Sequence, residues 1–126
     1  MRKKFVPVLL LLLLSLSAGC KATFTNLTPQ RQPRRPDNQY TVEVALNSQQ
    51  QTLRWQSIHP QIVVGNRLYP MTPTQLMTNR WEGVIPVPAS SSEVKYHYQF
   101  DFEYNTFGKP KNDSTRSADY LLKIVD

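Results

Sequence analysis

Residues 93–104 alternate between apolar and polar side chains without one interruption, and no other feature restricts the fold of this chain as strongly. The apolar set is Val94, Tyr96, Tyr98, Phe100, Phe102 and Tyr104, and the polar set is Glu93, Lys95, His97, Gln99, Asp101 and Glu103. Successive side chains of a strand point to opposite faces, whereas a helix would scatter both sets around its surface. We therefore predict one long β-strand with its aromatic face in a core. At about 3.4 Å per residue it spans roughly 40 Å, so we expect a bend or bulge.

The rest of the chain after residue 39 also carries strand signals, and none of it shows helical spacing over ten or more residues. Alternating or short apolar segments occur at residues 41–46, 51–55, 61–64, 67–71, 74–77, 81–87 and 117–125. Gly65-Asn66 suits positive φ and predicts a hairpin turn, while the polar residues 105–116 are expected to form a loop. Seven or eight such strands are typical of an antiparallel immunoglobulin-like β-sandwich, with a small closed barrel as the alternative.

The N-terminus has the organisation of an export signal. Residues 2–4 are basic, residues 8–14 are an unbroken apolar run, and small residues lead to Cys20. The run is too short for a transmembrane helix, which needs about 20 residues, and we interpret residues 1–19 as a signal peptide. Residues 16–20, Leu-Ser-Ala-Gly-Cys, resemble the lipobox of bacterial lipoproteins, with Ser17 where that pattern usually has Leu. The resemblance implies that Cys20 becomes the first mature residue and carries acyl chains on its sulfur and amino group.

The alternative for Cys20 is an ordinary free or disulfide-bonded thiol behind a conventional signal peptide. Because Cys20 is the single cysteine of the chain, it has no internal disulfide partner, and lipidation is the preferred interpretation. Acyl chains would anchor the protein to a membrane, since each buried CH₂ contributes about 0.8 kcal/mol. The residue after the cysteine is Lys21. An Asp at that position would resemble an inner-membrane retention signal of enteric bacteria, so its absence favours the outer membrane over the inner one.

Residues 20–38 form a polar segment in which prolines and arginines are interleaved. Prolines at 29, 33 and 36 favour an extended polyproline II chain, so this segment is expected to be a tether that holds a domain of residues 39–126 up to about 55 Å from the lipid. In the alternative interpretation its arginines contact anionic head groups, at about 1 kcal/mol each.

The charge balance argues against nucleic acid as a partner. Three of the 15 basic residues, Arg2, Lys3 and Lys4, belong to the signal segment, so the formal net charge falls from +6 to +3 in the remainder. Nucleic-acid binding requires a strongly basic face, and export makes it still less suitable.

Catalytic and metal-binding patterns are missing from the sequence. His59 and His97 have no neighbours at zinc-ligand spacing, and there is no nucleophile elbow or phosphate loop. Asp101 and Glu103 face the same way at about 6.8 Å, near the spacing of an inverting glycosidase pair, but any strand with i, i+2 carboxylates gives that spacing. We therefore expect no catalytic residues, no cofactor and no metal.

Candidate ligand-binding residues are aromatic side chains in irregular surroundings and polar side chains of the expected loop, namely Trp55, Trp81, Phe107, Asn112 and Asp113. Residues 81–88, Trp-Glu-Gly-Val-Ile-Pro-Val-Pro, and 94–96, Val-Lys-Tyr, resemble the central part of starch-binding-type modules. This resemblance implies an immunoglobulin-like sandwich. Because no Trp follows Trp81, it provides no counterpart of the C-terminal sugar site of such modules, and the ligand stays open. The sequence thus favours a lipid-anchored protein that binds another envelope component, with a protein as first choice and a carbohydrate as the alternative.

Overall fold

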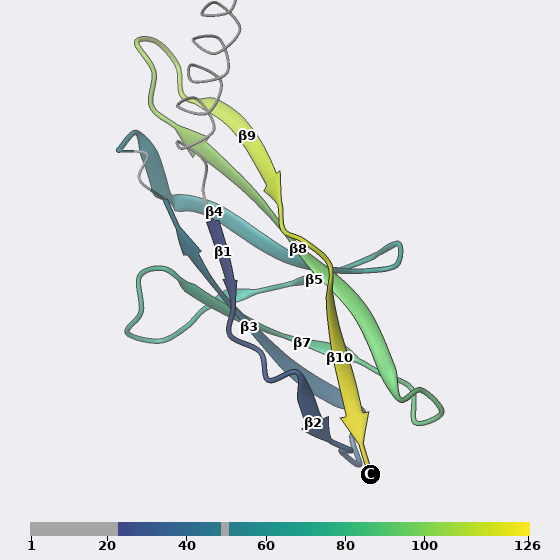
Figure 1. The fold of residues 1–126 in the computed structure, drawn as a ribbon. Helices are drawn as coiled ribbons and strands as arrows, with labels where there is room; N and C mark the ends of the chain where they lie inside the picture. The colour runs from purple at the N-terminus through teal and green to yellow at the C-terminus, as the bar shows by residue number, and fades with distance from the viewer. Residues whose placement is uncertain (1–22, 49–50) are drawn as a thin grey trace, which may run out of the picture.

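The computed structural model describes residues 23–48 and 51–126, and this part of the chain is all-β, without a helix. Its ten strands form two sheets that face one another (Figure 1). The strands are β1 (Thr23–Asn26), β2 (Arg31–Pro33), β3 (Gln39–Asn47), β4 (Leu53–Val64), β5 (Arg67–Pro70), β6 (Thr72–Pro73), β7 (Arg80–Pro86), β8 (Glu93–Tyr104), β9 (Lys111–Arg116) and β10 (Tyr120–Val125). A helix of sufficient length and hydrophobicity to span a membrane is not found in these residues.

The strand order is that of an immunoglobulin-like sandwich, as the strand signals predict. One sheet has the order β1-β3-β7-β6, and the other has the order β2-β10-β8-β4-β5, with β9 also paired to β8. All neighbours are antiparallel except β2 and β10, which are parallel. Immunoglobulin domains likewise set an ABED sheet against a GFC sheet, and β1-β3-β7-β6 and β10-β8-β4 reproduce these two orders.

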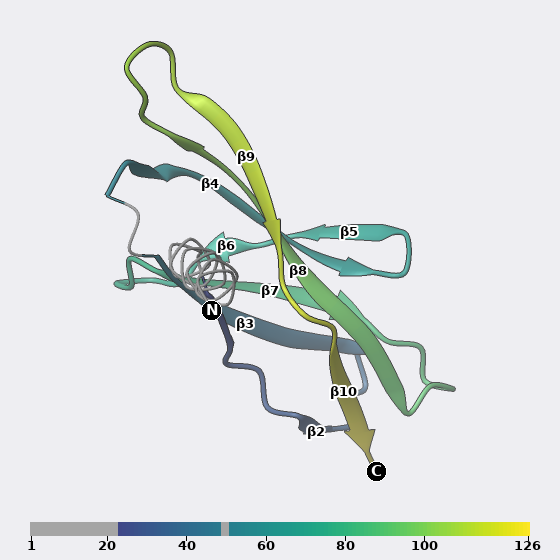
Figure 2. The same ribbon diagram turned by 45° about the horizontal axis from the view of Figure 1, so that its top comes forward.

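Strand β8 has the predicted bounds and provides the centre of the core. Tyr96, Tyr98 and Phe100 are 2%, 0% and 0% exposed, and Phe102 packs partly buried against them. β8 pairs with β4 on one edge and with β10 and β9 on the other, so it is the central strand of the larger sheet (Figure 2). Phe100 meets the ring of Trp81 edge-on at a centroid distance of 5.3 Å, which joins the two sheets.

Gly83 and Gly65 hold two positions that other residues would disturb. A Cβ at Gly83 on β7 would come within 2.8 Å of the Ile62 side chain and 3.0 Å of the Pro70 carbonyl oxygen, so glycine lets the two sheets approach each other there. Gly65 has φ +61° and turns β4 into β5, which confirms the predicted hairpin.

The folded domain begins well before residue 39, so the predicted extended tether is wrong for residues 23–33. β1 pairs with β3, and β2 pairs with β10. The physical reason is the buried phenol of Tyr98, whose hydroxyl donates to Asn26 Oδ1 at 2.7 Å. Asn26 Nδ2 in turn donates to the Tyr96 hydroxyl at 2.9 Å, and Phe24 meets Phe100 edge-on at 5.0 Å. The N-terminal segment therefore supplies hydrogen-bond partners to the hydroxyls of Tyr96 and Tyr98, and it covers the core that the rest of the chain forms.

Three further segments differ from the sequence-based expectation. Residues 53–55 and 61–64 belong to the single strand β4, which lies in the other sheet from β3, so the expected turn at Asn47-Ser48 makes no hairpin. Residues 74–77 form a turn in which Leu76 has φ +66°, and the short β6 lies before it. Half of the expected loop of residues 105–116 is β9, which pairs with the outer half of β8.

Replacing Phe100 by Ala should destabilise the domain by about 3–5 kcal/mol, because it leaves a cavity between two aromatic neighbours. Gln99→Ala, on the opposite face of the same strand, should change the free energy of unfolding by less than about 0.5 kcal/mol. Urea unfolding monitored by tyrosine and tryptophan fluorescence measures both. Equal midpoints for the two variants would contradict the assignment of the aromatic face to the core.

A fragment of residues 23–126 should fold, whereas a fragment of residues 40–126 should not. The shorter fragment lacks Asn26, the partner of the Tyr96 hydroxyl, and it leaves the Tyr98 hydroxyl only the Glu43 carbonyl oxygen at 3.2 Å. A buried polar group left unsatisfied costs about 1–3 kcal/mol. A small domain is stable by only about 5–15 kcal/mol, and the loss of Phe24 packing adds to the deficit. Thermal unfolding followed by circular dichroism compares the two fragments. The same cooperative transition in both would show that β1 and β2 are dispensable.

Candidate functional site

A bulge in β4 shapes the outer face of the larger sheet. β4 and β8 are in register at Arg54 and Glu103 and come back into register at His59 and Asp101. Four residues of β4, 55–58, therefore stand opposite Phe102 alone, and the ladder of backbone hydrogen bonds is interrupted there. Such bulges bend a strand and re-aim its side chains. Here the bend hollows the sheet surface.

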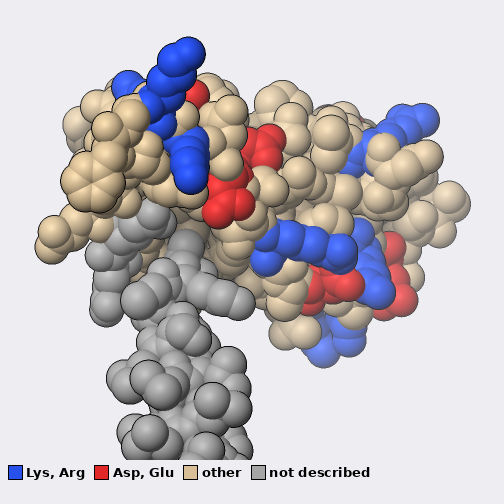
Figure 3. All heavy atoms as spheres, turned by 90° about the horizontal axis from the view of Figure 1, so that it is seen from above, with Lys and Arg blue, Asp and Glu red and all other residues tan. Residues whose placement is uncertain are grey.

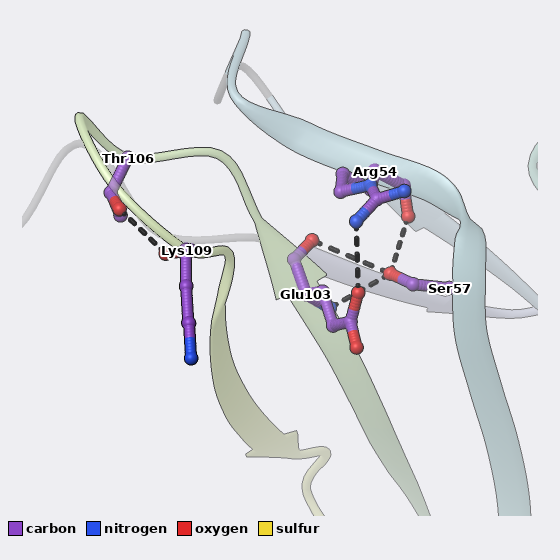
Figure 4. A network of polar contacts seen from close by, with 5 residues as sticks. All are labelled: Arg54, Ser57, Glu103, Thr106 and Lys109. Carbon is purple, nitrogen blue, oxygen red and sulfur yellow. Dashed lines mark hydrogen bonds and ion pairs between the residues drawn. The ribbon is translucent and has the colours of Figure 1, made fainter.

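Ser57 repairs the interrupted ladder. Its hydroxyl accepts the backbone N–H of Glu103 at 2.8 Å and donates to the carbonyl oxygen of Arg54 at 2.6 Å. The Arg54 guanidinium adds an ion pair with the Glu103 carboxylate, Nη1 to Oε2 at 3.1 Å (Figure 4). These contacts join the bulged segment of β4 to Glu103 of β8 at the Arg54 end of the bulge.

The hollow is an open groove of about 820 Å³ that crosses β4, β8 and β9. Its lining residues are Arg54, Gln56, Ser57, His59, Asp101, Phe102, Glu103, Asn112, Asp113 and Ser114. The register places Arg54, Glu103 and Asn112 in one cross-strand row and His59, Asp101 and Ser114 in the next. The groove thus offers three carboxylates, one guanidinium, one imidazole and several neutral hydrogen-bonding groups, and Phe102 is its one large apolar residue.

An ion-pair cluster continues the polar face along β8. Asp119 lies 3.1 Å from Arg116, 3.5 Å from His97 and 3.7 Å from Lys95. The hydrogen bond from Arg116, together with the nearby positive charges, lowers the pKa of Asp119. Burial and the Arg116 charge lower the pKa of His97, against the opposing effect of Asp119. The cluster therefore contains an ionised carboxylate whose charge is balanced by neighbouring basic side chains.

β9 borders the groove as an edge strand. Its register with β8 runs from Lys111 opposite Tyr104 to Arg116 opposite Gln99. Within residues 23–48 and 51–126 no other strand pairs with it, and its side chains are exposed except for the half-buried Thr115. An unpaired strand edge beside a polar groove can accept the main chain of an extended peptide.

The structure does not bring the five predicted ligand-binding residues together. Asn112 and Asp113 line the groove. Trp81 is only 4% exposed and belongs to the core, and Trp55 is 39% exposed and lies parallel to Trp81 with a centroid distance of 6.5 Å. Phe107 is fully exposed in the turn between β8 and β9. Cys20 lies outside the described residues. Trp81 therefore offers no open surface for a ligand, and Trp55 offers one face of its ring at most.

Sequence reasoning missed Arg54, Ser57, His59 and Ser114 as groove residues. The alternation of β8 does identify Asp101 and Glu103 as surface carboxylates. The bulge beside them depends on the pairing of two strands far apart in sequence, which no local pattern reveals. Pro60 is the one local signal, because a proline inside a strand that is not at a sheet edge marks a bulge or irregularity.

The carboxylates and histidines of the described residues do not form a metal-ligating group, since no three His, Cys, Asp or Glu side chains there gather in a suitable arrangement.

Comparison with known proteins identifies no relative by sequence. No family model matches the chain, and no curated protein matches it. Among solved structures, the chain is similar to a DUF4785 family protein from Legionella pneumophila, with 8% sequence identity and a TM-score of 0.44. That similarity covers 82% of this chain and 28% of the other chain, so the present domain spans about a quarter of that protein. A likeness at this level identifies neither a family nor a function.

Proposed function

We propose that this protein is a non-catalytic lipoprotein of the cell envelope, anchored through acyl chains on Cys20, whose domain binds an extended segment of another envelope protein. The outer membrane is the proposed location. The observation that carries the binding proposal is the unpaired edge of β9 beside the polar groove. The anchoring proposal rests on the lipobox-like residues 16–20 and on Cys20 being the only cysteine.

The chemistry of the groove favours a polypeptide as ligand. Main-chain amides need alternating donors and acceptors, and Gln56, Asn112 and Ser114 supply neutral groups of both kinds. The carboxylates of Asp101 and Asp113 and the Arg54 guanidinium can select charged side chains. β9 can extend its hydrogen bonding to an added strand, a recurring way in which sheets recognise peptides.

Carbohydrate binding is the second candidate, and the exposed part of Trp55 favours it, because a sugar ring can stack on an indole. Two observations place it second. Trp81 lies parallel to one face of the Trp55 ring, and Phe102 is the single aromatic residue that lines the polar groove. A saccharide there would rely on hydrogen bonds with little stacking surface.

Replacing Cys20 by Ala should release the protein from the membrane, because the acyl chains would be lost and each buried CH₂ contributes about 0.8 kcal/mol to anchoring. Metabolic labelling with a clickable fatty acid, followed by fractionation, tests this in the producing cell. Ser17→Ala is a matched control that keeps the cysteine and should still incorporate lipid. Full membrane retention of unlabelled Cys20→Ala protein would contradict the anchoring proposal.

A photo-crosslinking amino acid at Asn112 should give a discrete protein adduct in intact cells, whereas the same group at Val84, exposed on the outer face of the other sheet, should not. The adduct partner is then purified and titrated against the full-length protein. Asn112→Lys with Ser114→Lys should weaken its binding at least tenfold, about 1.4 kcal/mol, while Val84→Lys should leave it unchanged.

If the domain binds a carbohydrate instead, the photo-crosslinking experiment should give the opposite result. Carbohydrate binding requires no protein adduct at Asn112, together with calorimetric binding of an α-glucan or envelope glycan that Trp55→Ala abolishes. If the Asn112/Ser114 variant and the Val84 variant bound the purified partner equally tightly, the groove would not be the binding site.

A further inference from the structure

Three features gather at one end of the sandwich, which we term the loop end: the start of β1 at Thr23, the turn of residues 74–79, and the β8–β9 turn of residues 105–110. Thr23 pairs with Asn47, and the next residue, Phe24, pairs with Leu46. The N–H of Leu46 donates to the Asn79 carbonyl oxygen at 3.0 Å, which ties the 74–79 turn to this end. The two turns lie on the same side of the molecule in both ribbon views (Figures 1 and 2).

The N-terminal strand is also close to β9. Thr23 and Phe24 line a second groove, of about 710 Å³, together with Asp113, Ser114 and Arg116. This groove lies between the two sheets at the edge formed by β1 and β9. The point at which the described chain begins is therefore next to the strand that carries the β8–β9 turn.

The loop end presents large apolar side chains to solvent. Leu76 is 98% exposed, Met77 is 39% exposed, and Phe107 is fully exposed. Leu76 has φ +66°, a conformation that costs a residue with a Cβ on the order of 1 kcal/mol. A strained backbone that exposes a leucine suggests a contact outside the domain.

The turn that carries Phe107 is held by its own side chains. Thr106 Oγ1 donates to the Lys109 carbonyl oxygen at 2.8 Å (Figure 4). It also accepts the N–H of Gly108 at 3.3 Å. The phenyl ring is thus presented from an ordered turn. Ordering the turn in advance reduces the entropy lost when the ring binds.

Basic side chains accompany these apolar ones. Lys109 and Lys111 are exposed, and neither has an ion-pair partner in the described part of the chain. Figure 3 looks onto the molecule from above and shows, at the left of the view, Lys and Arg side chains beside uncharged ones, with Asp and Glu side chains next to them. Glu103, the nearest carboxylate before the turn along β8, is paired with Arg54. An aromatic ring next to lysines suits the boundary between acyl chains and anionic head groups.

The chain length between Cys20 and Thr23 brings this end to the membrane. Three Cα–Cα steps of about 3.8 Å allow a reach of at most about 11 Å. We propose that the loop end rests on the bilayer that holds the anchor, with Phe107 and Leu76 inserted in the interface and Lys109 and Lys111 against anionic head groups. This inference rests on the proposed lipidation of Cys20. It replaces a domain held up to about 55 Å away by one in direct contact with lipid.

Site-specific quenching in vesicles tests the inference on the full-length, acylated protein. Acylation blocks the thiol of Cys20, so Phe107→Cys or Leu76→Cys provides one reactive thiol for an environment-sensitive fluorophore. Leu68→Cys on β5 is the matched control, because Leu68 is also an exposed leucine, at 55%, and lies away from the loop end. The vesicles contain phosphatidylcholine and phosphatidylglycerol, with or without a doxyl-labelled acyl chain.

Labels at 107 and 76 should lose about half of their emission in doxyl vesicles, because an interfacial side chain lies roughly 5–10 Å into the boundary between head groups and acyl chains. The label at 68 should be unaffected. Equal, weak quenching at all three positions on vesicle-bound protein would overturn the inference and leave the anchor intact. Labelling of the parent protein at Cys20, with no association to vesicles, would instead refute the anchor and the inference together.

Discussion

The hydroxyl of Tyr98 is the constraint on which the rest of the domain depends. Burial raises its pKa above the ordinary range, so the phenol stays neutral and must find hydrogen-bonding partners inside the sandwich. It donates to Asn26, and it lies 3.1 Å from the Thr28 hydroxyl, which donates to the carbonyl oxygen of Glu43. These partners come from the N-terminal segment and from β3. These hydrogen bonds hold the N-terminal segment over the core. The position at which this segment begins therefore sets how close an anchor at Cys20 would hold the domain.

The second organising element is the length of β8, which runs for twelve residues and pairs with other strands along both edges. β8 keeps its alternation over twelve residues, and its two neighbours adapt to it. β4 adapts by the bulge that Ser57 caps. On the other edge β9 gives way to β10 at Ser117, whose side chain accepts the Tyr98 N–H at 2.8 Å while its own N–H donates to the Tyr98 carbonyl oxygen at 2.9 Å. The groove is a by-product of the first adjustment, and β9 as an unpaired edge is a by-product of the second.

The sequence predicts the parts of the fold whose signals are local. The alternation of residues 93–104 places β8 and its buried face, and Gly65-Asn66 places the β4–β5 turn. β9 was missed because Lys-Asn-Asp-Ser-Thr-Arg has no apolar alternation, and it becomes a strand only through pairing with β8. β1 and β2 were missed because prolines and arginines dominate their surroundings, whereas the decisive contacts of Phe24 and Asn26 lie about 70 residues further along the chain. For the same reason Asn112 and Asp113 were found as polar residues, but their groove was not.

β9 and β10 pair with the same edge of β8, but opening the two strands requires different free energies. The domain therefore has two levels of cooperativity. β10 carries the fully buried Leu122 and lies between β8 and β2, so its amides can exchange with solvent deuterium only when the core opens. β9 contributes no buried side chain, and its amides can exchange through separation from β8 alone. Separation of β9 from β8 therefore requires less free energy than opening of the core. A ligand that binds at β9, as proposed above, would meet a strand whose separation from β8 leaves the buried core intact.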